Sequence, residues 1–460
     1  MVKDIQSVMD AAKKLFFIGI GGISMSSLAF ACKKAGYKVA GSDRTESDMT
    51  KKLQNGKISV HIGHDAKNVE GYDAVVYTGA ISEENPEMKA AREKGIPVIY
   101  RADLLGWLMK TFRNRIGVAG MHGKSTATSM LSHIFISAGT DPTVMSGAET
   151  KEMGGAYRTG KSKEDFIFEA CEYKDSFLEM FPSVAVILNI DVDHTDYFSG
   201  IDQIKRSFAE FAAIPFKTGA ENPMLVACGD DEAALEIAAR SPRDVTFGIY
   251  NEDCDYVATK ISEKRGYYSF EIVKDGEPEG KISLRVPGYH NIYNALAAFA
   301  AADVCGIPCD KICSALSDFE GTLRRFEYKG NRDGVSVYID YAHHPREIDA
   351  VIATAKEVAG DGKVIALFEP HTYSRTAEHF DAFASSLSAA DNVILLDIYA
   401  AREVNTFGVS SAKLADAIPG ACYAPSYESA AALAVTYADE GDVILILGAG
   451  TIYKIADLIV

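Results

Sequence analysis

The amino-acid sequence predicts an α/β protein of three domains, each built around a largely parallel sheet. The chain has 460 residues, which is more than one hydrophobic core normally supports, and a typical domain has about 150 residues. Short apolar runs alternate with helix-length segments along most of the chain. Such alternation is typical of strand–helix–strand units, whose strands pair in parallel.

The first hundred residues predict a Rossmann-like parallel sheet. Apolar runs alternate there with segments of helical length, and a glycine pair separates the first run from the first helix. The predicted strands are 15–20, 37–40, 74–78 and 97–100, and the predicted helices are 22–36 and 86–94. We place this domain at residues 1–112.

The next series of strands and helices predicts a central α/β domain at residues 113–323. Its predicted strands are 115–119, 166–169 and 184–189, and its first helix ends near Ser137. From 253 to 286 the pattern changes to short alternating strands with turns at 264–266 and 274–276, which predicts an antiparallel extension. An Ala-rich helix at 291–302 follows.

A third series predicts a C-terminal Rossmann-like α/β domain at residues 324–460. Helices of ordinary length separate its predicted strands, which are 335–340, 363–368, 392–396 and 442–447.

The composition excludes several classes of protein. With 47% apolar and 24% charged residues the chain is an ordinary globular protein. A net charge of -17 argues against a general nucleic-acid binder, because neutralising phosphates needs a surplus of Lys and Arg. Since no apolar run approaches the ~20 residues that cross a bilayer and no signal peptide is recognisable, we expect a cytoplasmic protein without a membrane partner.

The cysteines carry no sign of a disulfide framework or a metal site. All eight are scattered through the chain, and in a reducing compartment such thiols stay unpaired. Cys305, Cys309 and Cys313 recur every fourth residue, but Gly306 and Pro308 interrupt a helix between the first two. Their spacing also lacks the paired ligands of a zinc motif.

A phosphate-binding loop is the strongest functional signal. Gly120-Met121-His122-Gly123-Lys124-Ser125-Thr126 follows a predicted strand and opens a predicted helix. Glycine lets backbone amides converge on phosphate oxygens, Lys124 suits the β and γ phosphates of ATP, and Ser125 offers a hydroxyl to Mg²⁺. Val118 stands where the strict pattern has glycine, so a plain helix-opening turn is the alternative. We expect a P-loop ATPase-type central domain.

Polar residues follow several predicted strands. Glu169 and His194 lie at the ends of two strands of the central domain, where ligands of a parallel sheet bind. A carboxylate there suits Mg²⁺, whereas an imidazole is a less usual ligand for so hard a cation. For either residue alone, a surface or capping role is the alternative.

Further polar residues cluster at helix starts and strand ends in the last third of the chain, which predicts one shared cleft. Asn291 has a helix cap as its structural alternative. The cluster comprises His290, Asn291, Asn294, Arg325, Asp340, His343, His344, His371 and Arg375.

The first glycine-rich turn predicts a second anionic ligand. Gly19-Ile-Gly21-Gly22-Ile-Ser24 with Asp43 after the next strand fits a dinucleotide cofactor or a nucleotide-sugar diphosphate. Ser24 replaces the third glycine of the dinucleotide pattern, and the ATP loop lies on a separate domain. We therefore favour the nucleotide sugar over NAD.

Taken in order, these segments resemble the Mur ligase family over nearly the whole chain. The resemblance is carried by Phe17–Ser26, Gly120–Thr126, Glu169-Ala-Cys-Glu172 with Ser176-Phe-Leu, Asn189–His194, Pro287–Asn291, Arg324–Glu327, Asp340–Pro345, Glu369–Arg375 and Gly448–Ile452. It implies a UDP-binding domain, an ATPase domain and a domain that carries the amino acid. It also implies ATP-dependent joining of L-alanine to the lactyl carboxylate of UDP-N-acetylmuramate through an acyl phosphate, in peptidoglycan precursor synthesis.

The resemblance implies roles for individual residues. Lys124, Ser125, Glu169 and His194 match the phosphate and metal contacts, with Mg²⁺ or Mn²⁺ as the metal. The residues around ATP would be Gly120 to Thr126, His290, Asn291, Asn294, Arg325 and Asp340. The UDP-sugar contacts would be Gly21, Gly22, Ser24, Met25, Ser26, Asp43 and Thr78. His343, His344, His371 and Arg375 would face the muramoyl carboxylate or alanine. The catalytic residues would be Lys124, Glu169, His194, His344 and Arg375.

Four residues depart from the family pattern, and two rival functions remain. Met121 replaces a threonine, Cys171 an acidic residue, Glu369 a glutamine and Thr372 an arginine. One rival is the related ligase that attaches a tripeptide to UDP-N-acetylmuramate during wall recycling. The other is a non-catalytic ATP sensor. The oligomeric state expected is a monomer or a homodimer.

Overall fold

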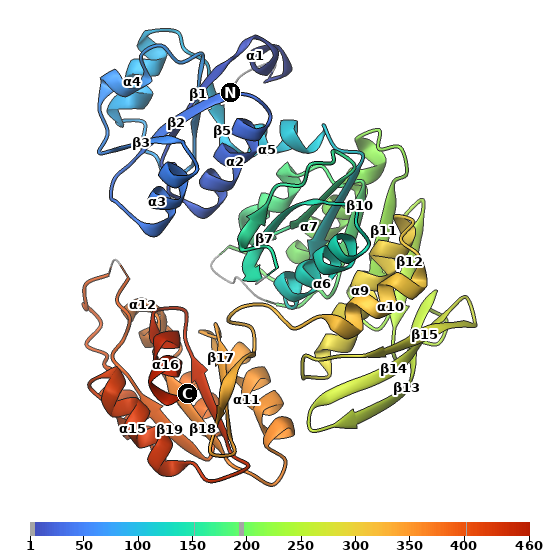
Figure 1. Cartoon of the computed structure of the whole chain (residues 1–460), viewed down its shortest axis with the longest axis vertical. Helices are drawn as coiled ribbons and strands as arrows, with labels where there is room; N and C mark the ends of the chain where they lie inside the picture. Colours follow the sequence, from blue (N-terminus) through green and yellow to red (C-terminus); the bar gives the residue numbers. More distant parts are fainter. Residues whose placement is uncertain (1–4, 151, 193–196, 402) are drawn as a thin grey trace. The chain divides into compact units, whose positions relative to one another are not determined.

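The computed structural model describes residues 5–150, 152–192, 197–401 and 403–460. Figure 1 shows the elements in chain order. The chain divides into two compact units, one of residues 1–255 with 297–308 and one of residues 256–296 with 309–460.

The N-terminal part of the first unit is a five-stranded parallel sheet in the order β3-β2-β1-β4-β5. Successive residues of β1 enter different cores, because Leu15 and Phe17 pack in one cluster and Phe16 and Ile18 in another. Both faces of this sheet are therefore covered, as the apolar runs predicted. Its elements are α1 (Ile5–Ala11), β1 (Lys14–Ile18), α2 (Ile23–Lys34), β2 (Lys38–Asp43), α3 (Asp48–Asn55), β3 (Ser59–Ile62), η1 (Ala66–Val69), β4 (Ala74–Tyr77), α4 (Pro86–Glu93), β5 (Val98–Tyr100) and α5 (Arg101–Met109).

The central part of the first unit has strands in the order β12-β11-β10-β6-β9-β7-β8. They pair in parallel except for β8, which is antiparallel to β7. Its elements are β6 (Asn114–Ala119), α6 (Lys124–Ser137), β7 (Thr143–Thr150), β8 (Gly155–Arg158), β9 (Asp165–Glu169), η2 (Tyr173–Glu179), β10 (Val184–Ile187), α7 (Ile201–Lys217), β11 (Met224–Cys228), α8 (Glu232–Ala238) and β12 (Asp244–Gly248).

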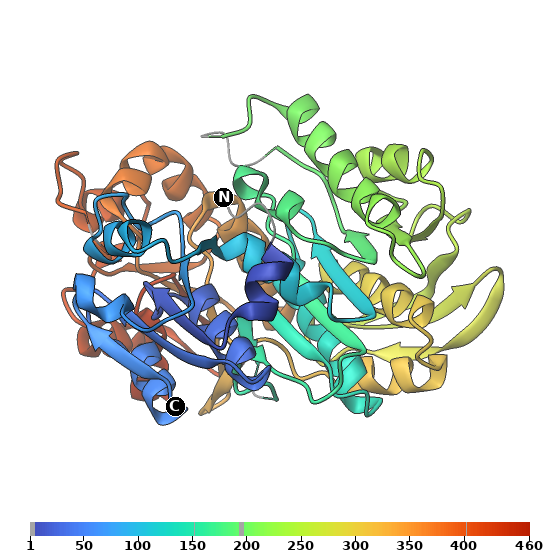
Figure 2. The ribbon, with the colours of Figure 1, turned by 90° about the horizontal axis from the view of Figure 1, so that it is seen from above.

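The second unit begins with the predicted antiparallel extension, which is confirmed. β13 (Tyr256–Lys264), β14 (Tyr267–Lys274) and β15 (Glu277–Ser283) are the yellow-green arrows of Figure 1 and Figure 2. Two-residue turns join them, and both central residues of each turn have positive φ, as in the Asp275-Gly276 turn with 50° and 85°. Such turns match the twist of paired strands. Helix α9 (His290–Val304) follows and is divided between the units, with its residues from Ala297 onward in the first, and α10 (Cys309–Asp318) belongs to the second.

The C-terminal sheet has the order β16-β17-β21-β18-β19-β20, and β16 alone among these described strands is antiparallel to its neighbour. In β18, Ala366 and Phe368 face one core, and Ile365 and Leu367 face the other. Its elements are β16 (Glu327–Arg332), β17 (Val335–Asp340), α11 (Pro345–Ala359), β18 (Val364–Phe368), α12 (Tyr373–Glu378), α13 (Phe380–Leu387), β19 (Asn392–Leu395), α14 (Ser411–Asp416), β20 (Cys422–Tyr423), α15 (Tyr427–Tyr437), β21 (Val443–Leu447), η3 (Ile452–Ile455) and α16 (Ala456–Ile459).

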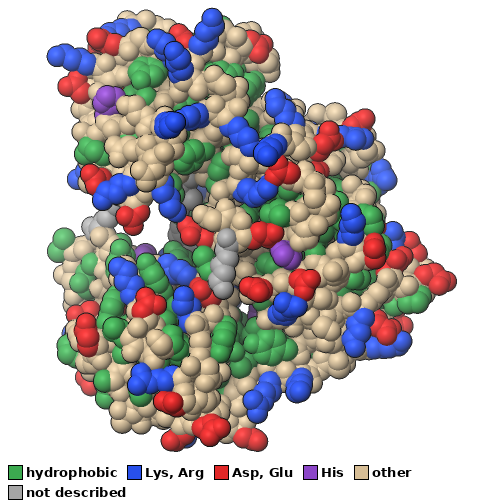
Figure 3. Space-filling model, viewed as in Figure 1, with side chains coloured by type: hydrophobic (Ala, Val, Ile, Leu, Met, Phe, Trp, Pro, Cys, Tyr) green, Lys and Arg blue, Asp and Glu red, His purple; other side chains and the backbone are tan. Residues whose placement is uncertain are grey.

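The predicted fold class, three α/β domains with parallel sheets, is confirmed. None of the helices in the described parts of the chain has the length and apolar character that a membrane crossing demands. On the face shown in Figure 3, Lys and Arg side chains are interspersed with Asp and Glu.

Candidate active site

The loop between β6 and α6 has the geometry of an anion-binding turn. Gly123 stands at the N-cap position of α6 with a φ of 84°, in the left-handed region that favours glycine. A Cβ atom on Gly120 would lie 2.9 Å from the Cβ of Leu188, so this position has no room for a side chain. Because backbone amides at a helix N-terminus attract phosphate, the loop can hold a polyphosphate.

Asn189 fixes the tip of this loop. Its side-chain oxygen accepts from the His122 amide at 2.9 Å, and its side-chain nitrogen donates to the His122 carbonyl at 3.0 Å. The Met121 amide donates to the Asn189 carbonyl at 3.3 Å, while the Met121 side chain is buried. The residue at position 121 therefore makes its contact in the loop through its backbone amide. Methionine can thus stand where the family pattern has threonine. Asn189 begins the Asn189–His194 motif, and no role was predicted for it from the sequence.

The Lys124 ammonium lies inside its own loop. It donates to the carbonyls of Gly120 at 2.6 Å and Met121 at 3.1 Å. It also forms a 3.0 Å ion pair with Glu172, whose side chain is 0% exposed. Glu172 is a further residue to which the sequence analysis gave no role, although it ends the quoted Glu169-Ala-Cys-Glu172 motif.

Ser125 and Glu169 meet beside the loop. The Ser125 hydroxyl donates to Oε2 of Glu169 at 2.8 Å, and the Gly147 amide donates to the same oxygen at 2.8 Å. A Cβ atom on Gly147 would lie 2.5 Å from that oxygen. Gly147 thus brings its backbone close enough to orient the carboxylate, a role that the sequence analysis did not foresee.

These groups fit a hard divalent cation. Carboxylate and hydroxyl oxygens are the ligands that Mg²⁺ prefers, and Mg²⁺ takes few protein ligands when phosphate oxygens and water supply the rest. His194, which the sequence analysis placed in the same site, lies outside the described residues. Within the described ranges, no group of three or more His, Cys, Asp or Glu side chains is arranged to hold a metal.

The first glycine-rich turn places most of its predicted residues around one helix start. The Gly21 amide donates to Asp43 at 2.8 Å, and Gly22 is the N-cap of α2. Ser24 accepts from the Arg101 guanidinium at 2.9 Å, which adds a cation that the sequence analysis missed. A Cβ atom on Gly19 would lie 3.8 Å from Thr78, so Thr78 borders the turn. The side chains of Met25 and Ser26 are buried within the domain.

In the second unit, Asn291 and Asn294 form one buried pair. Asn291 donates to the Pro287 carbonyl at 2.7 Å, and Asn294 donates to the side-chain oxygen of Asn291 at 2.9 Å. α9 begins one residue earlier, at His290. Asn291 therefore lies inside the first turn and is not an N-cap, which excludes the capping alternative.

Asp340 ends β17 as a buried carboxylate. It accepts from the amides of Phe326 and Ala342, both at 2.7 Å. Burial raises the pKa of Asp340 to about 6, and the nearby Arg325 guanidinium opposes this rise. The Arg325 guanidinium lies 5.5 Å from the ring centre of Tyr341.

His343, His371 and Arg375 come together, as the sequence analysis expected. The rings of His343 and His371 lie 6.1 Å apart, and an Arg375 nitrogen lies 3.3 Å from Nδ1 of His371. His371 also stacks on Tyr399, with ring centres 5.7 Å apart. Burial lowers the pKa of His343 and of His371, and the Arg375 charge lowers both further.

The imidazole of His344 has different neighbours. His344 is the N-cap of α11, and its ring lies edge to face against His379 with centres 4.8 Å apart. Its amide donates to Glu347 at 3.1 Å, and the His343 amide donates to the same oxygen at 2.9 Å. The structure therefore brings the His343 ring close to that of His371, whereas the His344 ring packs against His379.

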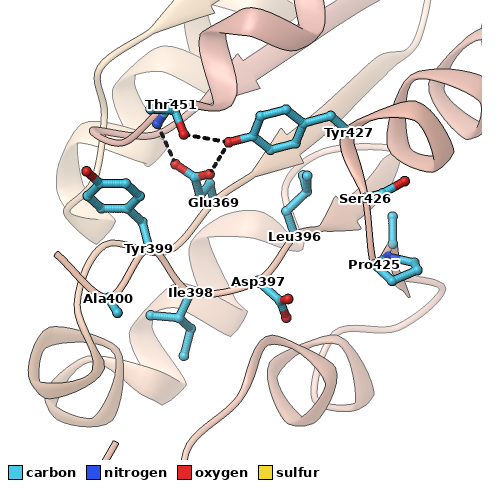
Figure 4. Close-up of a pocket in the computed structure, with 11 residues that line it drawn as sticks. Glu369, Leu396, Asp397, Ile398, Tyr399, Ala400, Pro425, Ser426, Tyr427 and Thr451 are labelled. Carbon is cyan, nitrogen blue, oxygen red and sulfur yellow. Dashed lines mark hydrogen bonds between the residues drawn. The ribbon is translucent and has the colours of Figure 1, made fainter. Parts of the chain in front are cut away.

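A cavity of about 310 Å³ opens at the carboxyl ends of the C-terminal strands. It is lined in part by Tyr399, which stacks on His371. Figure 4 shows Glu369 pointing toward Tyr427 and Thr451, and the Tyr427 hydroxyl donates to it at 2.8 Å. The Thr451 amide donates to its other oxygen at 2.9 Å. Thr372, the other departure in this region, caps α12 through its side chain. Glu369 thus joins the loops after β18 and β21.

The predicted nucleotide residues are divided between the two units. Lys124, Ser125 and Glu169 belong to the first unit, and the group from His290 to Asp340 belongs to the second. Hydrogen bonds fix side chains in each group, and in the second group those of Asn291 and Asn294 are buried.

Comparison with known proteins identifies the family. The Mur ligase family catalytic domain matches residues 14–113, the Mur ligase middle domain residues 118–302, and the Mur ligase glutamate ligase domain residues 324–450.

Two curated relatives match the chain over nearly its whole length. The UDP-N-acetylmuramate--L-alanine ligase of Caldicellulosiruptor bescii is 46% identical, over 97% of this chain and 98% of that protein. The ligase of the same name from Caldanaerobacter subterraneus subsp. tengcongensis is 44% identical, over 98% of this chain and 97% of that protein.

A solved structure is similar in fold over the same extent. The crystal structure of UDP-N-acetylmuramate-alanine ligase from Thermotoga maritima superposes with a TM-score of 0.78 at 27% identity, over 97% of this chain and 98% of that one. Family domains, full-length relatives and fold all agree, and the chain belongs to the Mur ligase family.

Proposed function

We propose that this protein is an ATP-dependent ligase that joins L-alanine to UDP-N-acetylmuramate. The observation that carries this proposal is the full-length likeness to proteins named UDP-N-acetylmuramate--L-alanine ligase, at 46% and 44% identity. The reaction forms a C–N bond in peptidoglycan precursor synthesis. A cytoplasmic location is part of the proposal.

The chemistry proceeds in two steps. An oxygen of the lactyl carboxylate attacks the γ-phosphorus of ATP, and the bond to ADP breaks. The amine of L-alanine then attacks the carbonyl carbon of the acyl phosphate, loses a proton and expels inorganic phosphate. Phosphorylation is required because a carboxylate is a poor electrophile, whereas phosphate is a good leaving group.

The loop after β6 is suited to hold the polyphosphate of ATP. The amides at the start of α6 and the Lys124 ammonium supply positive charge where negative charge builds on the transferred phosphoryl group. Ser125 and Glu169 would hold Mg²⁺, with His194 as a further ligand. A bound Mg²⁺ supplies charge neutralisation at the phosphates.

The other predicted groups are assigned to the remaining substrates. The turn at Gly21 and Gly22, with Ser24, Asp43 and Thr78, would take the UDP part of the sugar nucleotide. His343, His371 and Arg375 would orient the lactyl carboxylate or the carboxylate of alanine. Since the pKa values of both histidines are lowered, either imidazole is neutral near pH 7 and can accept a proton from the attacking amine.

The amine specificity is tested by ADP release with purified protein. UDP-N-acetylmuramate and ATP are supplied with L-alanine, with glycine or L-serine, with the wall tripeptide, or with no amine. We expect rapid ADP release with L-alanine. Release with the tripeptide and not with L-alanine would assign the protein to wall recycling, and ATP binding without release would make it a sensor.

Three further properties belong to the proposal. The domains are placed at 1–112, 113–323 and 324–460, and limited proteolysis should cleave near 112 and 323 before it enters the domains. The oligomeric state is a monomer or a homodimer, which light scattering distinguishes. Dependence on Mg²⁺, with Mn²⁺ as a substitute, is tested by chelation and reconstitution.

A further inference from the structure

The Lys124 ammonium already has an acceptor for each of its three N–H groups. Two are the carbonyls of Gly120 and Met121 within the loop. The third is Oε1 of Glu172, at 3.0 Å. An ammonium has three donors and can contact a phosphate only by giving one acceptor up. The Lys124–Glu172 pair is therefore a contact with which a nucleotide must compete.

Glu172 is held where it is by the turn that follows it. Its carbonyl accepts from the Asp175 amide at 2.9 Å. Lys174 and Asp175 both adopt left-handed backbone conformations, with φ of 53° and 55°. The Asp175 carboxylate anchors this turn by accepting from the hydroxyls of Tyr197 and Ser207. The backbone that carries Glu172 is therefore anchored, so its carboxylate cannot follow the ammonium through a shift of the turn.

Of the three acceptors, Glu172 is the one that a phosphate can replace without a loss of ion pairing. An exchange of carboxylate for phosphate leaves the ammonium next to an anion, whereas loss of a loop carbonyl would disrupt the turn that holds the nucleotide. After the exchange, Glu172 remains as a buried negative charge close to the bound phosphates. Repulsion at short range in a partly dry site is strong, so it opposes nucleotide binding.

We propose that Glu172 is a positioning residue that competes with nucleotide phosphates for Lys124, and so lowers nucleotide affinity and speeds the release of ADP. The proposal rests on the proposed function, because it requires a nucleotide at this loop. In the absence of nucleotide, Glu172 keeps the ammonium in the loop. When ADP leaves, the Glu172 carboxylate pairs with the Lys124 ammonium again.

The test is nucleotide binding to the full-length protein, measured by calorimetry and by stopped-flow displacement of a fluorescent ADP analogue, in the presence of a chelator. In Glu172→Gln the shape of the side chain is kept and its charge is removed. We expect ADP to bind tighter by about tenfold, with most of the change in a slower dissociation rate. The ADP affinity of Glu172→Asp, whose carboxylate reaches less far, should lie between those of the wild type and Glu172→Gln.

Glu87 provides a matched control. It is also 0% exposed, and it accepts from Ser42, His64 and Asn68 within the N-terminal domain. Glu87→Gln also removes a buried negative charge, so its stability changes, but its ADP affinity should stay that of the wild type. A general effect of lost buried charge would tighten binding in both variants and would overturn the proposal.

The outcomes separate this proposal from the proposed function. If wild-type protein binds neither ATP nor ADP, the assigned function fails, and with it the proposed competition between Glu172 and nucleotide phosphates. If wild-type protein binds ADP but folded Glu172→Gln binds it equally or more weakly, the competition alone fails. A weakening seen only with Mg²⁺ added would make Glu172 a metal ligand and would also overturn the competition.

Discussion

The hydroxyl of Ser125 lies 2.8 Å from the carboxylate of Glu169 and donates a hydrogen bond to it. The two residues come from neighbouring strands and their loops. β6 and β9 pair in parallel with Val118 opposite Glu169, so the phosphate loop begins where β9 ends. A hydroxyl and a carboxylate oxygen thereby meet at the start of α6.

Removal of either group should disable phosphoryl transfer. Ser125→Ala removes one of the oxygen ligands proposed for Mg²⁺ and Glu169→Gln removes the charge of the other, so we expect kcat to fall about 10² to 10³-fold while the fold is kept. Coupled measurement of ADP release gives the rate. Ser132→Ala is the control, since the Ser132 hydroxyl is also buried on α6 but donates to the Thr128 carbonyl, within its own helix. An equal loss of kcat in Ser132→Ala would contradict the assignment of Ser125 and Glu169 to the active site.

Gly147 should tolerate no side chain. Its amide holds Glu169, and an added Cβ would lie 2.5 Å from the carboxylate oxygen. We expect Gly147→Ala to displace Glu169 and to lower kcat at least tenfold, with a melting temperature within a few degrees of the wild type. Gly155→Ala, also in this sheet, meets only the Tyr157 amide nitrogen at 4.0 Å among its described neighbours and should be as active as the wild type.

Lys124 should be needed for stability as well as for turnover. Lys124→Met removes the phosphate contact, so ADP formation should be abolished. It also removes the cation next to fully buried Glu172, and breaking a buried pair costs about 3 kcal/mol or more. Urea denaturation should report this loss, and Lys124→Met with Glu172→Gln should recover most of it without activity. A fully stable Lys124→Met variant would contradict the buried pair.

Asp340 should make stability depend on pH in the acid range. Burial raises its pKa from 3.8 to about 6. A carboxyl whose folded-state pKa is raised stabilises the fold at low pH, and this contribution is lost as pH rises toward 6. In Asp340→Asn the dependence disappears. The stability advantage of wild type over Asp340→Asn should therefore be larger at about pH 5 than at about pH 7.5, by roughly 1 kcal/mol. A constant difference in urea denaturation would refute the raised pKa.

Local sequence patterns located most of the regular structure. Strands such as β10, β18 and β21 are buried on both faces, so they appear as short continuous apolar runs, a pattern typical of strands in a covered parallel sheet. The hairpins of the second unit were marked by Arg265-Gly266 and Asp275-Gly276, whose positive φ angles suit few other residue pairs. These signals are local, and the sequence contains them in full.

Several elements escaped prediction because their signals are not local. β7 contains Ser146, Gly147, Glu149 and Thr150, so its pattern is that of a loop, and its strand character comes from pairing with β8 and β9. β3 is largely exposed and β20 has two residues. In β3 Val60 and Ile62 alternate with Ser59 and His61, but four residues are few for a recognisable pattern, and β20 is too short to show one.

By itself, the sequence determined the phosphate loop, because its glycines, lysine and serine are adjacent residues at the junction of a strand and a helix. Only the tertiary structure decided what surrounds that loop. Glu172 lies 48 residues from Lys124 and Asn189 lies 67 residues from His122, and nothing in either local pattern specifies those partners. Strand order brings them together, and strand order follows from how the whole sheet buries its two faces, a property that no short segment possesses.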